Sequence, residues 1–146
     1  MHYEDNNRGT FQHRELARRL IDFDGLRYGN ITPTDIDGII EYKNIAYIIY
    51  EFKYCNSMVP YGQELCLKRM CDDLSKEGKI AVFLICEHYR NDGSDINASL
   101  AKVRELYYNG KIYSIYAGKT VKEVTDKIIK RAEQEIISYR KKLNSR

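Results

Sequence analysis

The uninterrupted apolar run IAVFLIC at residues 80–86 constrains the fold of this chain more than any other feature. A strand that faces solvent on one side alternates apolar and polar residues, whereas a strand covered on both faces is apolar throughout. Residues 45–54, rich in Ile and Tyr, also begin apolar on both faces. The two segments together predict a sheet with a layer of structure on each side.

The helix that we expect on one face of this sheet spans residues 61–76. Side chains that can face inward recur along it at i, i+4, i+7 and i+11, which is the spacing of one helical face. These positions are Gln63, Leu67, Met70 and Leu74. Gly78 follows the segment and favours a helix end there. Another helix is predicted over residues 11–22, and Gly9-Thr10 directly before it offers an N-cap.

The last helix is predicted to begin at Thr120, because Glu123 stands three residues later and completes a capping box. We expect it to reach about Leu143, with Val121, Val124, Ile128 and Ala132 facing inward. Basic residues crowd the last twenty residues of the chain: Lys127, Lys130, Arg131, Arg140, Lys141, Lys142 and Arg146. Such a segment can follow phosphates by releasing counterions, although a solubilising helix face is the plainer interpretation.

Two hairpins complete the expected sheet. Residues 35–42 and 45–54 flank a tight turn at Lys43-Asn44. Residues 103–108 and 112–116 flank Asn109-Gly110, which is a strong signal for a primed turn. The order of elements is therefore helix, two strands, helix, strand, hairpin, helix. This order predicts an α/β fold with a mixed central β-sheet flanked by helices.

Length and charge limit the class of protein. A chain of 146 residues favours a single domain over residues 1–146, with a loose tail at 1–9 and a frayed end at 144–146. No apolar stretch is long enough to span a membrane, and the polar N-terminus lacks a signal region. We therefore expect a cytoplasmic protein, and the Lys-, Ile-, Asn- and Tyr-rich composition indicates a microbial or phage-infected host cell. The formal net charge of +3 is too small to establish a nucleic-acid partner.

The four cysteines, Cys55, Cys66, Cys71 and Cys86, are expected to be reduced thiols. No C-x-x-C pair occurs, so the spacing of a zinc site is absent. Small buried thiols are the plain interpretation. A four-cysteine iron–sulfur cluster is the alternative, and it would require all four side chains to meet.

The chemistry of the first hairpin centres on Glu51 and Lys53. They share one face of their strand, because side chains two residues apart point the same way. An unpaired buried charge is costly, so two charges on a covered strand need a partner. Folding the hairpin about Asn44 places Asp37 opposite Glu51, and directly opposed side chains come within about 5 Å. Two carboxylates this close repel each other unless a divalent cation lies between them.

Carboxylate oxygens in this number suit Mg²⁺ or Mn²⁺. Lys53 would lie beside the cation and stabilise negative charge on a phosphate. An Asp, a Glu and a Lys around a metal are a minimal set for phosphodiester hydrolysis. Plainer interpretations exist for each part: an exposed Glu51–Lys53 ion pair, a turn at residues 35–38, and a Gln63 that caps its own helix.

The pattern D-x(13)-E-F-K at residues 37–53 resembles the motif of the PD-(D/E)xK nuclease superfamily. The preceding segment PTDIDG, residues 33–38, resembles the "PD" element with a small insertion. The resemblance implies a restriction-endonuclease-like core. It also implies that Asp37, Glu51 and the backbone carbonyl of Phe52 bind the metal, and that Lys53 is the catalytic lysine.

The resemblance extends to two helices. Members of this superfamily commonly have an acidic residue on the first helix, and Glu15 would be that further metal ligand. Many carry a Gln or Lys on the helix after the motif strand, and Gln63 matches this catalytic position. The proline does not directly precede an aspartate, which leaves Asp35 or Asp37 as the ligand. The hairpin register favours Asp37 as the metal ligand. Asp35 would then contact the metal ligands without binding the metal itself.

These observations lead to a functional expectation. We expect a metal-dependent nuclease with Mg²⁺ or Mn²⁺ as cofactor, acting on DNA in preference to RNA, and a homodimer is compatible with so small a chain. The alternative is a catalytically inactive protein on the same fold that binds nucleic acid or acts as an inhibitor. The thirteen tyrosines could stack on bases, although most are expected to pack within strands.

Overall fold

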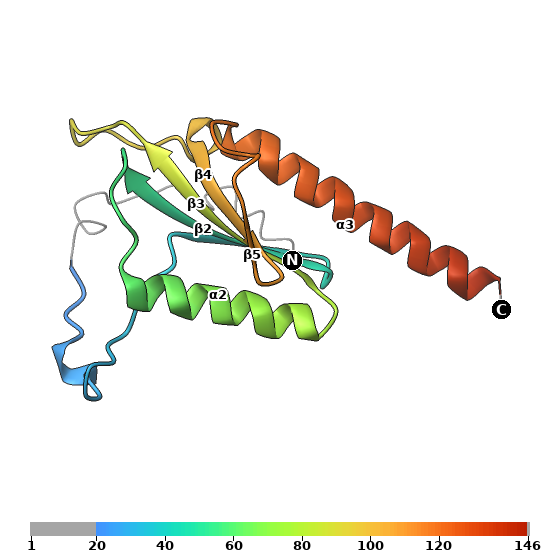
Figure 1. Ribbon diagram of the computed structural model, residues 1–146, viewed down its shortest axis with the longest axis horizontal. Helices are drawn as coiled ribbons and strands as arrows, with labels where there is room; N and C mark the ends of the chain where they lie inside the picture. Colours follow the sequence, from blue (N-terminus) through green and yellow to red (C-terminus); the bar gives the residue numbers. More distant parts are fainter. Residues whose placement is uncertain (1–19, 146) are drawn as a thin grey trace, which may run out of the picture. The chain divides into compact units, whose positions relative to one another are not determined.

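The computed structural model describes residues 20–145, which form an α/β fold with a mixed five-stranded sheet (Figure 1). The strands are β1 (Gly38–Tyr42), β2 (Ala46–Tyr54), β3 (Ile80–His88), β4 (Lys102–Tyr108) and β5 (Lys111–Tyr113). The helices are α2 (Tyr61–Lys76), α3 (Val121–Asn144) and the short 3-10 helices η1 (Asp24–Leu26) and η2 (Ala98–Leu100). The predicted fold class and order of strands are confirmed.

The sheet has the strand order β1-β2-β3-β4-β5, so each strand pairs with its neighbour in sequence. β1 and β2 pair antiparallel, as do β3 with β4 and β4 with β5. β2 and β3 run parallel. The helix α2 connects them and returns the chain to the end of the sheet at which β2 began. The parallel pair lies in the middle of the sheet, where both strands are covered.

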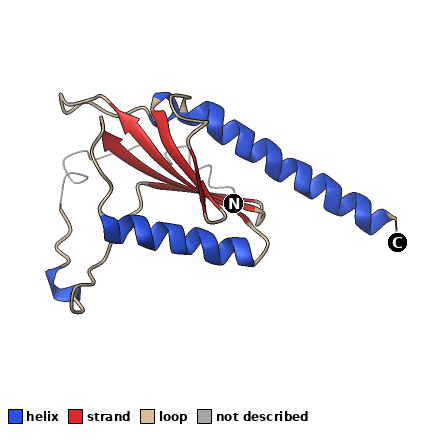
Figure 2. Ribbon diagram, viewed as in Figure 1, coloured by secondary structure: helices blue, strands red, loops and turns tan. Residues whose placement is uncertain are grey.

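Each face of the sheet has its own apolar core. The even-numbered residues of β2 and β3, such as Ile48 and Leu84, pack with Val124 and Ile128 of α3. The odd-numbered residues, such as Phe83, pack with Leu67 and Cys71 of α2. Figure 2 shows α2 and α3 on opposite sides of the strands. The predicted covering of residues 80–86 on both faces is therefore confirmed.

The helix phases agree with the predictions at most positions. All four inward positions expected on α3, Val121, Val124, Ile128 and Ala132, are buried. On α2, Gln63 and Leu67 are buried as expected, but Met70 is 37 % exposed and Cys71 is buried instead. The prediction for Met70 was wrong because the buried stripe continues from Leu67 in a step of four residues, and a step of three rotates Met70 away from the sheet.

Several predicted boundaries were too wide. β1 begins at Gly38 rather than at 35, and β5 ends at Tyr113 rather than at 116. The chain turns after Tyr113, where the N–H of Ala117 donates to the carbonyl of Ser114. Residues 11–19 of the first predicted helix lie outside the described residues. Residues 20–22 of that prediction are not helical.

The chain divides into two compact units, Met1–Thr34 and Asp35–Arg146. The described part of the first, residues 20–34, contains η1 and an isolated bridge between Tyr28 and Ile31, and nearly all of it is exposed. The sheet and both α-helices belong to the second unit. A single domain over residues 1–146 stays a prediction, and its tail at 1–9 lies outside the described part. No helix within the described residues is long and apolar enough to cross a membrane.

Candidate active site at the open end of the first hairpin

The turn of the β1–β2 hairpin fixes which residues face each other. Lys43 and Asn44 both adopt positive φ, 49° and 58°, and the N–H of Ile45 donates to the carbonyl of Tyr42. Pairing then runs from Tyr42 opposite Ala46 to Gly38 opposite Tyr50. The next residues along are Asp37 and Glu51. The predicted register about Asn44 is therefore confirmed.

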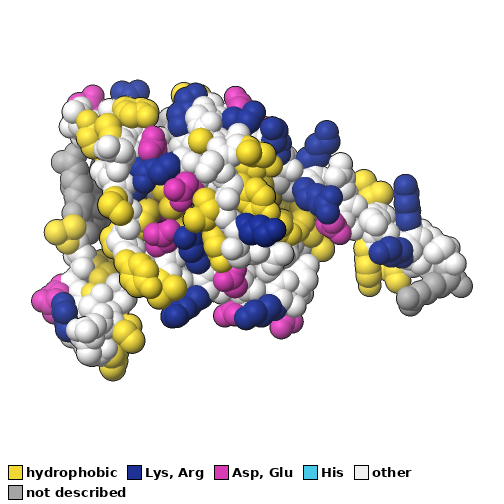
Figure 3. Space-filling view, viewed as in Figure 1, with side chains coloured by type: hydrophobic (Ala, Val, Ile, Leu, Met, Phe, Trp, Pro, Cys, Tyr) yellow, Lys and Arg dark blue, Asp and Glu magenta, His cyan; other side chains and the backbone are white. Residues whose placement is uncertain are grey.

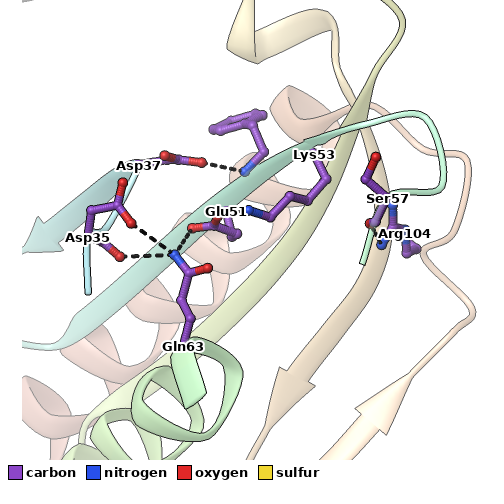
Figure 4. A network of polar contacts seen from close by, with 8 residues as sticks. Asp35, Asp37, Glu51, Lys53, Ser57, Gln63 and Arg104 are labelled. Carbon is purple, nitrogen blue, oxygen red and sulfur yellow. Dashed lines mark hydrogen bonds and ion pairs between the residues drawn. The ribbon is translucent and has the colours of Figure 1, made fainter. Parts of the chain in front are cut away.

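Glu51 is the buried charge of the site, with 2 % of its surface exposed. One carboxylate oxygen, Oε1, lies 2.7 Å from Nζ of Lys53, and the other, Oε2, accepts a hydrogen bond of 2.9 Å from Gln63 (Figure 4). Burial raises the pKa of Glu51 above its ordinary value, the hydrogen bond from Lys53 opposes that rise, and the charge of Asp37 adds to it. The fold thus holds a carboxylate where its charge is disfavoured, and it supplies two donors to offset this.

Asp37 directly precedes β1. Its carboxylate accepts a hydrogen bond from β2 at a point where β1 no longer pairs with that strand. Its Oδ2 accepts a hydrogen bond of 2.7 Å from the backbone N–H of Phe52. β1 pairs no further than Tyr50, so the outer edge of β2 is open from this point. The N–H and carbonyl of one strand residue point to the same side. The carbonyl of Phe52 therefore also faces the open edge beside Asp37.

Gln63 connects the first turn of α2 to both strands of the hairpin. Besides Glu51, its Nε2 contacts the backbone carbonyl of Asp35 at 3.1 Å and Oδ1 of the same residue at 3.3 Å. The amide is buried at 7 % exposure. α2 begins after Pro60 with no side-chain cap, so the plain interpretation of Gln63 as a cap of its own helix is wrong. Asp35 supports Glu51 through this amide, as Figure 4 shows.

Two residues that the sequence analysis did not include, Glu87 and Arg104, form a second set of polar contacts at the end of β2 and β3. Glu87 lies opposite Lys53 in the parallel register of β2 and β3. Nε of Arg104 lies 2.6 Å from Oε1 of Glu87, while its Nη1 and Nη2 donate to the carbonyls of Ser57 and Cys55, each at 2.8 Å. Arg104 thereby ties the end of β3 to the loop that leads from β2 into α2.

A register shift in the sheet explains why Arg104 reaches Glu87 and the loop after β2. Glu105 lies opposite Ile85 and Val103 opposite Cys86, so Arg104 is an extra residue in β4. Such a bulge changes the direction of a side chain. The sequence of β4 contains no pattern from which the bulge could be predicted. Glu87 could have been found, because it follows the apolar run at 80–86 on the same strand face as Ile85.

The donors around Glu51 fit a divalent cation in kind. Asp37 and Glu51 supply carboxylate oxygens, Phe52 supplies a carbonyl, and hard oxygen ligands of this sort suit Mg²⁺ or Mn²⁺. In the arrangement described here, the carboxylates face N–H and ammonium donors. Within residues 20–145, no group of three or more His, Cys, Asp or Glu side chains is placed to hold a metal ion. The metal therefore stays a prediction, and Glu15 lies outside the described residues.

The cysteines do not assemble a cluster. Cys71 belongs to the core beneath α2, whereas Cys86 belongs to the core beneath α3, so the sheet separates them. Burial raises the pKa of each thiol to about 12, which keeps both protonated. Cys55 and Cys66 are half-buried free thiols. The interpretation as reduced thiols fits this arrangement, and a four-cysteine iron–sulfur centre does not.

Comparison with known proteins adds no relative to this description. The chain matches no protein-family model, and no curated protein or solved structure matches it significantly.

Proposed function

We propose that this chain is a Mg²⁺- or Mn²⁺-dependent nuclease of the PD-(D/E)xK superfamily that hydrolyses phosphodiester bonds, with DNA preferred to RNA. The observation that carries the proposal is the buried Glu51, held between Lys53 and Gln63 with Asp37 beside it. A fold that only needed a stable strand would place an apolar residue there, since a buried ion pair is weak evidence for stability. A charged side chain that is kept buried at one end of a hairpin, despite its energetic cost, indicates a functional site.

Each residue has a role in this proposal. Asp37, Glu51 and the carbonyl of Phe52 would hold the cation, which supplies stabilisation of the charge that develops on the phosphate. Lys53 is 22 % exposed, so its ammonium can reach a phosphate oxygen while its stem stays packed. Gln63 holds the Glu51 carboxylate in one orientation, and Asp35 holds Gln63.

The finer fold assignment belongs to the same proposal. A restriction-endonuclease-like core is supported by two features: the acidic residues lie on an antiparallel hairpin, and α2 then leads into a parallel third strand. The proposed partner is nucleic acid. Exposed basic side chains line the outer half of α3, where Figure 3 shows dark blue groups, and these could contact the phosphate backbone. A homodimer and a cytoplasmic, phage- or microbe-type setting remain part of the proposal.

The test is a cleavage assay with Mg²⁺ or Mn²⁺ on circular, linear, branched and single-stranded DNA, with matched RNA. We expect Glu51→Gln and Lys53→Met each to reduce the rate by about a hundredfold or more, because the first removes a charged ligand of the cation and the second removes the ammonium that stabilises the phosphate. The matched control changes another ion pair, Lys122 with Asp126 on α3, whose atoms lie 2.6 Å apart. Lys122→Met and Asp126→Asn should keep full activity. Full activity in both site variants would overturn the proposal.

A second candidate is a nucleic-acid-binding or inhibitor protein that does not cleave. The observation that favours it is the engagement of each carboxylate with a donor of the chain itself, Asp37 with the Phe52 N–H and Glu51 with Lys53. Calorimetric titration with Mn²⁺ separates the two candidates. Heat and a thermal shift that disappear in Glu51→Gln support the nuclease, whereas neither signal in the unaltered chain supports the binding protein.

A further inference from the structure

A cavity of about 330 Å³ lies between α3 and the sheet, on the face opposite Glu51. Its floor is apolar and includes Val82 of β3, Leu106 of β4 and Ile128 of α3. Cavities that bind small molecules begin at about this size and are lined mainly by apolar and aromatic side chains. The even-numbered residues of the strands form this floor, so the cavity is separate from the candidate active site.

Three tyrosines give the cavity its aromatic lining: Tyr108 at the end of β4, Tyr113 at the end of β5, and Tyr116 in the turn that follows. All three are half-buried. None of their hydroxyls has a hydrogen-bond partner within the part of the chain that the structure describes. These hydroxyls are not among the buried side-chain oxygens of the described residues that lack a partner, so they are accessible to solvent or to a ligand. The lining therefore offers flat apolar surfaces together with free polar groups.

Two cations at the rim determine the sign of charge that the cavity accepts. Lys127 and Arg131 lie one turn apart on α3, and none of the residues that line the cavity is acidic. Nζ of Lys127 lies 5.7 Å from the ring centroid of Tyr116, which holds the ammonium over the aromatic wall. Arg131 contacts Glu135 at 3.0 Å, but both side chains are well exposed, so this pair is weak and leaves Arg131 able to bind an anion.

We propose that this cavity binds a planar aromatic ring that carries an anionic group, a class that includes nucleoside monophosphates. The ring would lie against the tyrosines, and the anion would face Lys127 and Arg131. The proposal does not depend on nuclease activity, because no residue of the cavity belongs to the network around Glu51.

Isothermal titration calorimetry with AMP tests the site, in EDTA so that no divalent cation takes part. Adenosine and inorganic phosphate are titrated separately, because each carries only half of the proposed chemistry. The informative variant is the double change Lys127→Gln and Arg131→Gln. Its matched control is Lys122→Gln with Lys130→Gln, which removes the same charge from exposed positions of α3 that do not line the cavity.

We expect AMP to bind at least about tenfold more tightly than either adenosine or phosphate, since ring and anion contribute together. The cavity variant should weaken AMP binding by about tenfold or more, and the control variant should not, because charge-assisted contacts are lost only in the former. Glu51→Gln should bind AMP like the unaltered chain, even if its cleavage is lost. Absence of AMP binding at about 5 mM would overturn the proposal, as would equal binding by both double variants or loss of binding in Glu51→Gln.

Discussion

At the scale of single residues, the buried charge of Glu51 is expected to lower the stability of the folded protein near neutral pH. Its pKa is raised in the folded state, mainly by burial, above the ordinary value of 4.5. Below that value both folded and unfolded chains hold the proton, and burial of Glu51 has no charge penalty. As the pH rises toward the folded pKa, the unfolded chain loses its proton first, so the free energy of unfolding falls. The full penalty is present near neutral pH.

The variant Glu51→Gln should therefore be more stable than the unaltered chain near neutral pH. The advantage should shrink as the pH is lowered to 4.5 and below, because Glu51 is then neutral as well. Thermal unfolding without divalent cations at several pH values measures this difference. A variant whose stability relative to the unaltered chain falls as the pH rises toward neutral would show that the Lys53 ion pair outweighs the burial of Glu51.

Gln63 is expected to stabilise the site more than its single amide suggests. In Gln63→Ala, one oxygen of the buried Glu51 loses its donor, and an unsatisfied buried group costs about 1–3 kcal/mol. The carbonyl of Asp35, an exposed residue, loses a hydrogen bond that water can replace. The neighbouring change Glu64→Ala breaks a half-buried pair with Lys68, at 2.6 Å on the side of the helix, and should cost no more than about 1 kcal/mol. Urea unfolding of both variants makes the comparison. Equal losses would argue against a special role for Gln63.

At the scale of elements, the bulge in β4 supports the site from a distance. Arg104 joins β3 to the loop between β2 and α2 through Glu87 and the carbonyls of Cys55 and Ser57. This loop leads from Lys53 to Gln63, and Cys55 within it adopts a positive φ of 48°. A residue in that conformation is strained unless its surroundings hold it. We therefore propose that Arg104 positions this loop and, through it, the candidate site.

Replacement of Arg104 by Lys should lower both stability and activity. A lysine has one point of contact in place of the planar fork, so it cannot hold Glu87 and both carbonyls together, and we expect a loss of about 1–3 kcal/mol. The control Arg131→Lys alters an exposed pair with Glu135 and should change stability by less than about 0.5 kcal/mol. Urea unfolding and the cleavage assay measure the two effects. A variant that matches its control in both would remove Arg104 from the supporting network.

Features that depend on residues close together in the sequence were predicted correctly, whereas features that depend on pairing or packing between distant segments were not. The pairing of Asp37 with Glu51 was predictable because a short turn and strand alternation fix it locally. Burial of Val124 and Ile128 was predictable from helical periodicity. The position of Arg104 was not, because it depends on a register shift between β3 and β4. The exchange of Met70 for Cys71 was missed because both fit a helical stripe, and only the packed sheet selects between them.

At the scale of the whole molecule, the unit Asp35–Arg146 contains both apolar cores, whose buried members within residues 20–145 lie between Ile48 and Ile128. Removal of residues 1–30 should therefore leave the cooperative unfolding transition in place and change stability by less than about 1 kcal/mol, since the described part of the removed segment, residues 20–30, contributes no buried member to either core. Circular dichroism during heating tests this. Loss of the transition would show that the first unit is required for the second to fold.

The same truncation bears on Glu15. If this residue is a further metal ligand, the shortened chain and the full-length variant Glu15→Gln should both lose cleavage while they remain folded. Cleavage at the full rate in Glu15→Gln would remove this residue from the proposed site.

The mixed pairing of the sheet also has a consequence for the order of folding. The β1–β2 hairpin closes across a short turn, whereas the parallel pairing of β2 with β3 must wait until α2 has spanned the sheet, and such distant contacts form slowly. Asp37 and Glu51 are brought together by the early hairpin, but Gln63 and Glu87 arrive only with the later pairing. We therefore expect the nascent hairpin to hold its two carboxylates with only its own donors, Lys53 and the Phe52 N–H, beside them. The rate of refolding should then respond to the repulsion between Asp37 and Glu51 more than equilibrium stability does.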